Sequence, residues 1–236
     1  SGFLFFSMKR KVALIGPTTL MISLPRVWVK KHQLAKGQEV TIEEKEGSLL
    51  VHAPAQHIMQ MATVHFTSGF LARSIRSFYR QGYHEITITC DDSIDLDELN
   101  TALEQYLGLE LIEHTMKRCV LRNVADSLDQ EFDVLFRKIF LMNQVMGQDI
   151  FDALSSPHSE KIEAIEKMER TNNKLVNLCF RILNKSNKMG DGTKIRYAVV
   201  LSCMENIADH YRDLCVLLRK NTFSGNINNI KSFFTQ

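Results

Sequence analysis

The hydrophobic pattern of the chain changes near Val124, and this change constrains the fold more than any other feature. Before that residue, apolar residues alternate in short runs bounded by Gly and Pro, a pattern typical of short strands and small helices. After it, apolar residues recur at spacings of three and four over long stretches, which indicates long helices. A chain of 236 residues is long enough for two or three small domains. The sequence therefore predicts a multidomain α+β protein.

The first predicted domain, residues 8–53, is a small β-rich unit. Pro25 suits the first turn of a helix, and Gly37 follows that helix. The predicted order is strand, strand, helix, strand, strand, over Lys9–Leu14, Leu20–Leu24, Arg26–His32, Val40–Glu44 and Ser48–His52. A unit of about 45 residues buries too little surface to be stable alone. We therefore expect it to complete its core with a second copy of the chain.

Charge is distributed unevenly between this unit and the rest of the chain. Residues 8–52 contain eight Lys or Arg and four Glu, a net charge of +4, whereas the whole chain carries +2, so the remainder carries −2. A basic module on a mildly acidic body is typical of a DNA-binding unit with a sensing or oligomerising body, although a solvated basic face has the same charge. Six basic residues are the predicted phosphate contacts: Lys9, Arg10, Lys11, Arg26, Lys30 and Lys31.

The run RKVALIGPTTLMISLPRVWVKKHQLAKGQEVTIEEKEGSLLVH resembles the swapped-hairpin DNA-binding domains of the SpoVT/AbrB/MazE class. The shared features are a basic pair before the first strand, a Leu-Pro before a short basic helix, and the pattern L-x-K-G-x-x-V before the last hairpin. The resemblance implies a domain-swapped homodimer that binds double-stranded DNA. It places Arg10, Lys11 and Lys30 at basic DNA-contacting positions, and Thr18 and Thr19 in the loop that approaches DNA. The chain has GPTT where these domains usually have a glycine-basic pair.

The second predicted domain, residues 56–122, is a small α/β unit. Its elements are predicted as helix, strand, helix, strand, strand, over Gly69–Arg80, Glu85–Cys90, Asp95–Leu107, Glu110–Thr115 and Arg118–Arg122. Acidic residues in the first turn of the second helix suit the helix dipole. We expect a ferredoxin-like arrangement, without a glycine-rich phosphate loop.

The third predicted domain, residues 124–220, is an antiparallel bundle of three helices, over Leu128–Phe151, Ser159–Asn187 and Thr193–Lys220. Asn172 falls within the apolar stripe of the second helix, with Glu169 at its edge, so Asn172 needs a polar partner in the core. On the third helix, Glu205 and Asp209 lie one turn apart and repel each other unless a cation neutralises them. Oxygen ligands suit Mg²⁺, Ca²⁺, Mn²⁺ or iron, but spacing alone favours a solvated face.

The third helix, IRYAVVLSCMENIADHYRDL, looks like the PhoU helix that carries the E-x-x-x-D metal motif, with Arg196 in the place of the arginine at the start of that helix. The resemblance implies that Glu205 and Asp209 bind a divalent or iron-type metal ion. EKMERTNNKL looks like the companion helix, with Asn172-Asn173 where PhoU proteins have Ile-Asp. Over residues 8–220, the domain order resembles archaeal PhoU-type phosphate uptake regulators with an AbrB-like N-terminal domain.

These patterns predict a homodimeric, DNA-binding transcriptional regulator of phosphate uptake whose PhoU-like body senses or relays phosphate status. The alternative is an accessory protein that binds a phosphate transporter component or a signalling protein, with a first domain that mainly dimerises. An antitoxin-like protein is a third hypothesis, which the long regular bundle disfavours, since antitoxin tails are usually short and disordered before binding.

Several classes of protein are disfavoured by what the sequence lacks. No HExxH pair, nucleophile elbow or phosphate-binding loop is present, so we do not expect an enzyme. No apolar run approaches the roughly 20 residues that span a bilayer, so we expect no membrane insertion. Five cysteines without a CxxC pattern indicate reduced thiols in the core and a cytoplasmic protein.

Overall fold

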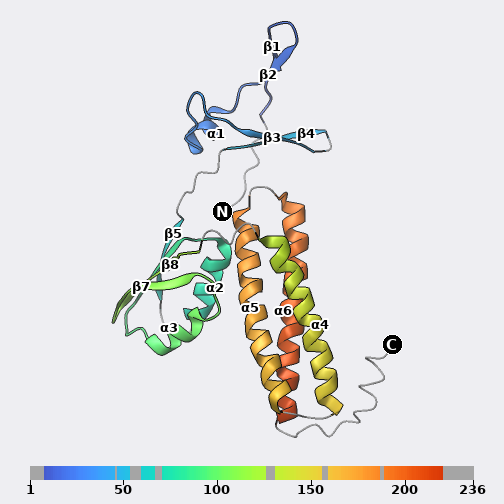
Figure 1. Cartoon of the computed structure of the whole chain (residues 1–236). Helices are drawn as coiled ribbons and strands as arrows, with labels where there is room; N and C mark the ends of the chain where they lie inside the picture. Colours follow the sequence, from blue (N-terminus) through green and yellow to red (C-terminus); the bar gives the residue numbers. More distant parts are fainter. Residues whose placement is uncertain are drawn as a thin grey trace. The chain divides into compact units, whose positions relative to one another are not determined.

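The computed structural model mixes helices with small β-sheets (Figure 1), which confirms the predicted α+β class. The chain divides into two compact units, residues 1–58 (unit 1) and residues 59–236 (unit 2). The predicted α/β and helical domains therefore belong to one compact unit. The described residues are 8–45, 47–53, 60–66, 71–125, 131–155, 159–186 and 189–219.

Unit 1 consists of two separate hairpins and one short helix. Its elements are β1 (Ala13–Ile15), β2 (Thr19–Met21), α1 (Arg26–Lys31), β3 (Thr41–Lys45) and β4 (Ser48–His52). β1 pairs with β2, and β3 with β4, both antiparallel. The order of elements is the predicted one, but the first two strands are shorter. None of the described side chains in this unit is buried, and Leu14, Leu20 and Val27 are 64%, 68% and 75% exposed.

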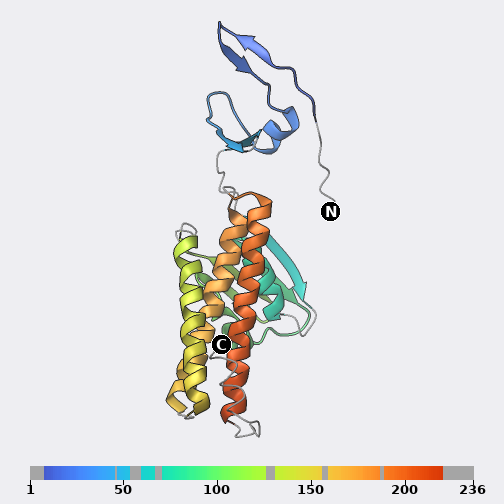
Figure 2. The ribbon, with the colours of Figure 1, turned by 90° about the vertical axis from the view of Figure 1, so that its right-hand side faces the viewer.

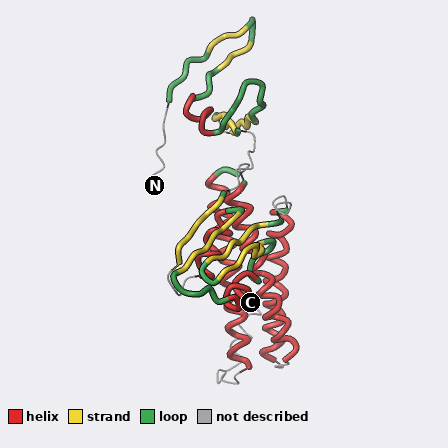
Figure 3. The backbone as a smooth tube through the Cα atoms, turned by 90° about the vertical axis from the view of Figure 1, so that its left-hand side faces the viewer, coloured by secondary structure: helices red, strands yellow, loops and turns green. Residues whose placement is uncertain are grey.

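Unit 2 begins with a four-stranded sheet. The strands are β5 (Met61–Phe66), β6 (Glu85–Cys90), β7 (Leu109–Thr115) and β8 (Arg118–Asn123), in the spatial order β5-β6-β8-β7. β5 is parallel to β6, and the other pairs are antiparallel. Two helices, α2 (Leu71–Gln81) and α3 (Leu96–Leu103), supply buried residues to the core beside this sheet. In Figure 3 the strands of unit 2 are yellow and its helices are red.

The order of these elements is β-α-β-α-β-β, whereas a ferredoxin-like unit has the order β-α-β-β-α-β. The prediction of a ferredoxin-like arrangement is therefore wrong. The predicted order also lacked β5, the first strand of the sheet. β5 lies at the edge of the sheet, and its residues alternate between exposed and only half-buried, so its hydrophobic pattern is weak.

Three long helices complete unit 2 and lie side by side as an antiparallel bundle (Figures 1 and 2). They are α4 (Phe132–Ser155), α5 (Ser159–Lys185) and α6 (Asp191–Arg219). The predicted apolar stripe of α5 is largely buried, for example at Ile165, and α6 also supplies buried residues such as Leu201. Asn172 is fully buried and accepts a hydrogen bond of 3.1 Å from Nδ2 of Asn143 on α4. The prediction that Asn172 needs a polar partner is confirmed, and the pair fixes the register of α4 against α5.

A fully buried arginine on α5 joins the bundle to the α/β part of unit 2. Nη1 of Arg181 donates hydrogen bonds to the backbone oxygens of Tyr79 (3.1 Å) and Tyr83 (2.8 Å), at the end of α2 and just after it. One turn further along α5, Nδ2 of Asn184 donates to the backbone oxygen of Arg80 (2.7 Å). These bonds satisfy carbonyls that the end of a helix leaves without intrahelical partners. The last turn of α2 is therefore held on α5 by polar contacts.

The cysteines are all free thiols, and Cys203 is exposed whereas the other four are buried. Burial raises the pKa of Cys179 to about 12, so its thiol stays protonated. Four of the five cysteines are thus core residues, as predicted, whereas the prediction is wrong for Cys203. Among the described residues, we find no helix with the length and apolar character to cross a membrane.

Replacing Gly108 by Ala should destabilise unit 2. Gly108 has a φ of +76°, and a Cβ atom there would lie 2.4 Å from Cβ of Ala125. The left-handed backbone alone costs a residue with a Cβ about 1–2 kcal/mol, and the overlap adds to this. We expect Gly108→Ala to lower the free energy of unfolding by at least that amount in urea denaturation. Gly192→Ala is the control, because nothing lies within 4 Å of its added Cβ; equal losses in the two variants would contradict the prediction.

Candidate functional site

The predicted DNA contacts all lie in unit 1 and are exposed. Lys9, Arg10 and Lys11 precede β1, Thr18 and Thr19 lie at the β1–β2 turn, and Arg26, Lys30 and Lys31 are on α1. No ion pair between described residues engages the six cationic side chains of this set. Basic residues in the last turn of α1 also suit the negative end of the helix dipole. These side chains are thus available to phosphate groups.

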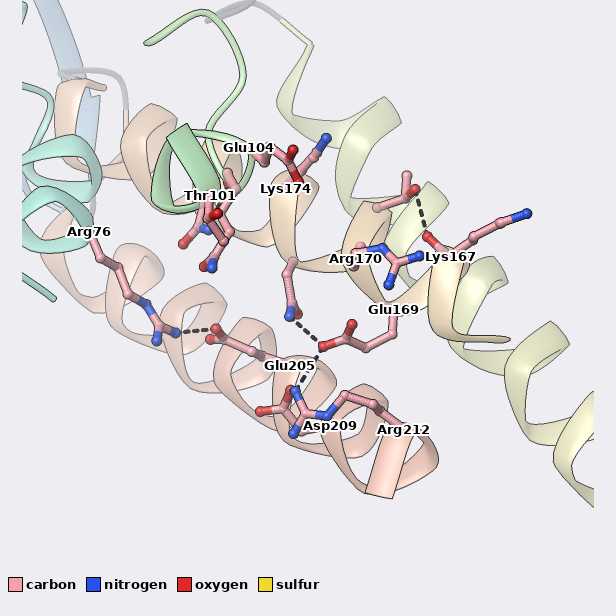
Figure 4. Close-up of a pocket in the computed structure, with 14 residues that line it drawn as sticks. Arg76, Thr101, Glu104, Lys167, Glu169, Arg170, Lys174, Glu205, Asp209 and Arg212 are labelled. Carbon is pink, nitrogen blue, oxygen red and sulfur yellow. Dashed lines mark hydrogen bonds and ion pairs between the residues drawn. The ribbon is translucent and has the colours of Figure 1, made fainter. Parts of the chain in front are cut away.

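A second candidate site is a cavity of about 570 Å³ in unit 2, formed by residues of α2, α3, α5, α6 and the segment after α3 (Figure 4). Glu205 and Asp209, the predicted metal ligands, both line it. Arg76 of α2 and Glu169 of α5 also line it. The complete lining is Arg76, Thr101, Glu104, Gln105, Lys167, Glu169, Arg170, Thr171, Asn173, Lys174, Asn177, Glu205, Asp209 and Arg212.

The carboxylate of Glu205 lies between two arginines from α2. Nη2 of Arg80 donates to both of its oxygens, at 2.8 and 3.0 Å, and Nη2 of Arg76 donates to Oε1. Arg80 also donates through Nε to Oδ1 of Asn177, at 2.7 Å. Burial lowers the pKa of Arg80, and the charge of Glu205 opposes that change. Because Arg76 and Arg80 are one turn apart on α2, one face of this helix supplies both partners.

A second carboxylate cluster lies one turn further along α6. Nη1 of Arg212 donates to Oε1 of Glu169 and to Oδ1 of Asp209, each at 3.1 Å. Nδ2 of Asn173 donates to the same oxygen of Glu169, at 2.7 Å. Burial raises the pKa of Glu169, whose side chain is only 5% exposed; the charge of Arg212 opposes this shift, and the nearby carboxylate of Asp209 adds to it.

Both predicted metal ligands are therefore already neutralised by guanidinium groups. A metal ion at Glu205 and Asp209 would have to displace hydrogen bonds from Arg76, Arg80 or Arg212. Among the described residues, no group of three or more His, Cys, Asp or Glu side chains is placed to hold a metal ion. As they lie, these carboxylates do not fit a metal ion, and metal binding at them stays a prediction.

The sequence analysis missed the arginines of α2, because Arg76 and Arg80 are more than a hundred residues from Glu205. Their spacing of four on the amphipathic helix α2 is the signal that marks them as neighbours on one face. The sequence pattern of α5 placed Glu169 at the edge of its apolar stripe, and the structure has Glu169 at that position. Arg170 and Lys174, also on the cavity wall, are one turn apart on α5.

No protein-family model, curated protein or solved structure matches the chain.

Arg80→Gln should destabilise unit 2 more than the loss of a surface ion pair does. The variant removes the guanidinium whose Nη2 donates to both oxygens of Glu205, and it leaves Oδ1 of Asn177 without its donor. Hydrogen bonds to charged groups contribute about 1.5–3 kcal/mol each, so we expect a loss in that range in urea denaturation. The control is Arg122→Gln, because Arg122 pairs with Glu85 at the surface, where an ion pair contributes less than about 1 kcal/mol. Losses of equal size would contradict the prediction.

Glu169→Gln should stabilise the protein at neutral pH. The pKa of Glu169 is raised in the folded state, so the folded protein favours the protonated side chain and loses stability as pH rises through that pKa. A Gln stays neutral and can donate to Asp209. We expect the variant to unfold at a higher temperature than the parent at pH 7. Below pH 4.5, the ordinary value for Glu, this advantage should vanish; an advantage that does not change with pH would contradict the assignment.

Proposed function

We propose that the protein is a homodimeric, DNA-binding transcriptional regulator of phosphate uptake that acts in the cytoplasm. In this proposal unit 1 binds DNA, and unit 2 senses or relays phosphate status. The main support for this proposal is the composition of the surface of unit 1. Exposed cationic side chains lie beside exposed apolar ones, and none of the described side chains of that unit is buried.

Dimerisation is proposed because the described residues of unit 1 contain no buried side chain that could form a core. Isolated two-stranded hairpins are marginally stable in water, and each hairpin here pairs only with itself. A second copy that interleaves its hairpins with these would bury the exposed apolar side chains. The large apolar side chains of this unit that are exposed are Met8, Val12, Leu14, Ile15, Leu20, Met21, Ile22, Val27, Ile42, Leu49 and Leu50.

DNA binding follows from the charge that such a dimer would present. Each copy contributes the same basic set from the start of β1 and from α1, so a two-fold dimer places two equal basic faces on one molecule. Contacts from Lys and Arg to phosphates release counterions, which makes binding fall steeply with salt. The exposed Thr18 and Thr19, at the β1–β2 turn, can add hydrogen bonds to phosphate or base edges.

The role of unit 2 rests on its resemblance to PhoU proteins and on the charged cavity where α2 and α3 meet the bundle. That cavity joins the α/β part to two bundle helices through Glu205 and its arginines. A ligand bound there would contact both parts at once, so it could report phosphate status to the rest of the dimer.

A second candidate function is supported by apolar side chains on α4 and α6. Phe140, Leu141 and Val145 on α4 are exposed, as are Ile195 and Val199 on α6. Exposed apolar surface on a helical bundle is typical of a protein-binding face. In this alternative the protein is an accessory that binds a phosphate transporter component or a signalling protein, and unit 1 mainly dimerises.

DNA binding separates these functions, and fluorescence anisotropy on labelled duplexes measures it. One duplex comes from the region upstream of the protein's own gene and the other is unrelated, both over a salt series. We expect Arg10→Ala/Lys30→Ala to weaken binding at least about tenfold and to reduce its salt dependence, because each residue would contact phosphate in both copies. The control, Arg137→Ala/Lys138→Ala, removes two exposed charges from α4 and should bind like the parent.

Light scattering on the same samples should give the mass of a dimer for the parent and for both variants. Preference for the upstream duplex supports a regulator, and equal binding to both duplexes contradicts sequence-specific regulation. A folded dimer that binds neither duplex at low salt would overturn the proposal in favour of the accessory.

A further inference from the structure

The cavity in unit 2 is lined by more cationic side chains than carboxylates. Its lining includes five cationic side chains and four carboxylates, and Arg80 adds a sixth cation behind Glu205. Arg212 is shared by Glu169 and Asp209, and Arg80 neutralises Glu205. Because Arg212 serves two carboxylates, one negative charge is left there in addition to Glu104. Four cations remain against these two charges, namely Arg76, Lys167, Arg170 and Lys174.

Arg76 is the cation that an incoming anion can recruit most readily. Arg80 already donates to both oxygens of Glu205, so Glu205 stays neutralised if Arg76 turns away. The side chain of Arg76 is 43% exposed, against 18% for Arg80. Figure 4 shows Arg76 extending from α2 to the wall of the cavity. Arg76 therefore lies at the solvent-accessible side of its own ion pair.

Arg170 and Lys174 supply positive charge from the opposite wall. They lie one turn apart on α5, and no ion pair between described residues engages either side chain. Like charges at this spacing repel, so an anion placed between them relieves the repulsion. Thr101 of α3 lines the same cavity and can donate a hydroxyl hydrogen bond. The walls thus offer a guanidinium from α2, a guanidinium and an ammonium from α5, and a hydroxyl from α3.

We propose that this cavity binds a small molecule bearing phosphoryl groups, with Arg76, Arg170 and Lys174 as its main contacts. Guanidinium groups pair with phosphate oxygens through two parallel hydrogen bonds, and lysine adds a point charge. A volume of about 570 Å³ is in the range of small-molecule sites and exceeds the size of a single phosphate ion. A regulatory role for this ligand rests on the proposed function, whereas its binding to the cavity does not require DNA.

Isothermal titration calorimetry of the full-length protein tests the site, with pyrophosphate, ATP and inorganic phosphate as probes and citrate as a polyanion without phosphoryl groups. We expect one pyrophosphate or ATP per chain, and weaker binding of phosphate and citrate. Arg76→Gln, and Arg170→Gln/Lys174→Gln, should each raise the Kd at least about tenfold, because each removes charge-assisted hydrogen bonds. Lys138→Gln is the matched control, since Lys138 is exposed on α4 and does not line the cavity.

Three further measurements fix the interpretation. Thermal unfolding identifies any variant that fails to fold. If Arg76→Gln does not fold, Arg76→Lys replaces it. This variant keeps the positive charge but loses the planar guanidinium, so it should bind pyrophosphate with intermediate affinity. Arg10→Ala/Lys30→Ala should bind pyrophosphate like the parent, which excludes unit 1 as the site. DNA anisotropy on the same samples separates failure of this site from failure of the proposed function. Equal binding by all variants, citrate binding as tight as that of pyrophosphate, or no binding of any probe would overturn the proposal.

Discussion

The pairing of the mostly buried carboxylate of Glu205 with two arginines is the interaction on which the architecture of unit 2 depends. A carboxylate that is mostly removed from water is costly unless a cation and hydrogen bonds compensate it. Here the compensation comes from Arg76 and Arg80, on a helix of the α/β part, while Glu205 belongs to the bundle. The requirement for this pairing fixes where α2 lies relative to α6. The same placement creates the cavity, because α2 and α3 then form one of its walls and the bundle the other.

The docking of the two parts of unit 2 includes a row of polar side chains on α5. On α5, Asn177, Arg181 and Asn184 follow one another at spacings of four and three, and each contacts α2 or the chain just beyond α3. Apolar contacts tolerate small shifts along a helix, whereas hydrogen bonds to defined carbonyls do not. The polar face of α5 therefore specifies one register, at the cost of placing a fully buried guanidinium in the interface.

Local patterns predicted most of the secondary structure, because helices and hairpins are defined by neighbours in sequence. The spacing of apolar residues placed α5 within two residues of its observed end, and the turn around Gly47 placed β4 at its observed bounds. The edge strand β5 and the sheet order were missed, since they depend on pairing between distant segments. The same limit applied to the site. The pattern on α6 identified Glu205 and Asp209, but the partners of Glu205 come from α2, and the contact of Arg212 with both Asp209 and Glu169 depends on how α5 and α6 pack.

The uneven burial of the cysteines has a practical consequence. Cys203 is exposed on α6, two residues before Glu205, whereas burial protects the thiols at the other four positions. A maleimide dye or spin label should therefore attach to the native chain at one position, without prior removal of cysteines. Such a probe would lie within one helical turn of Glu205, whose carboxylate pairs with the arginines of α2. Its emission or mobility would then report directly on rearrangements at the junction between the sheet and the bundle.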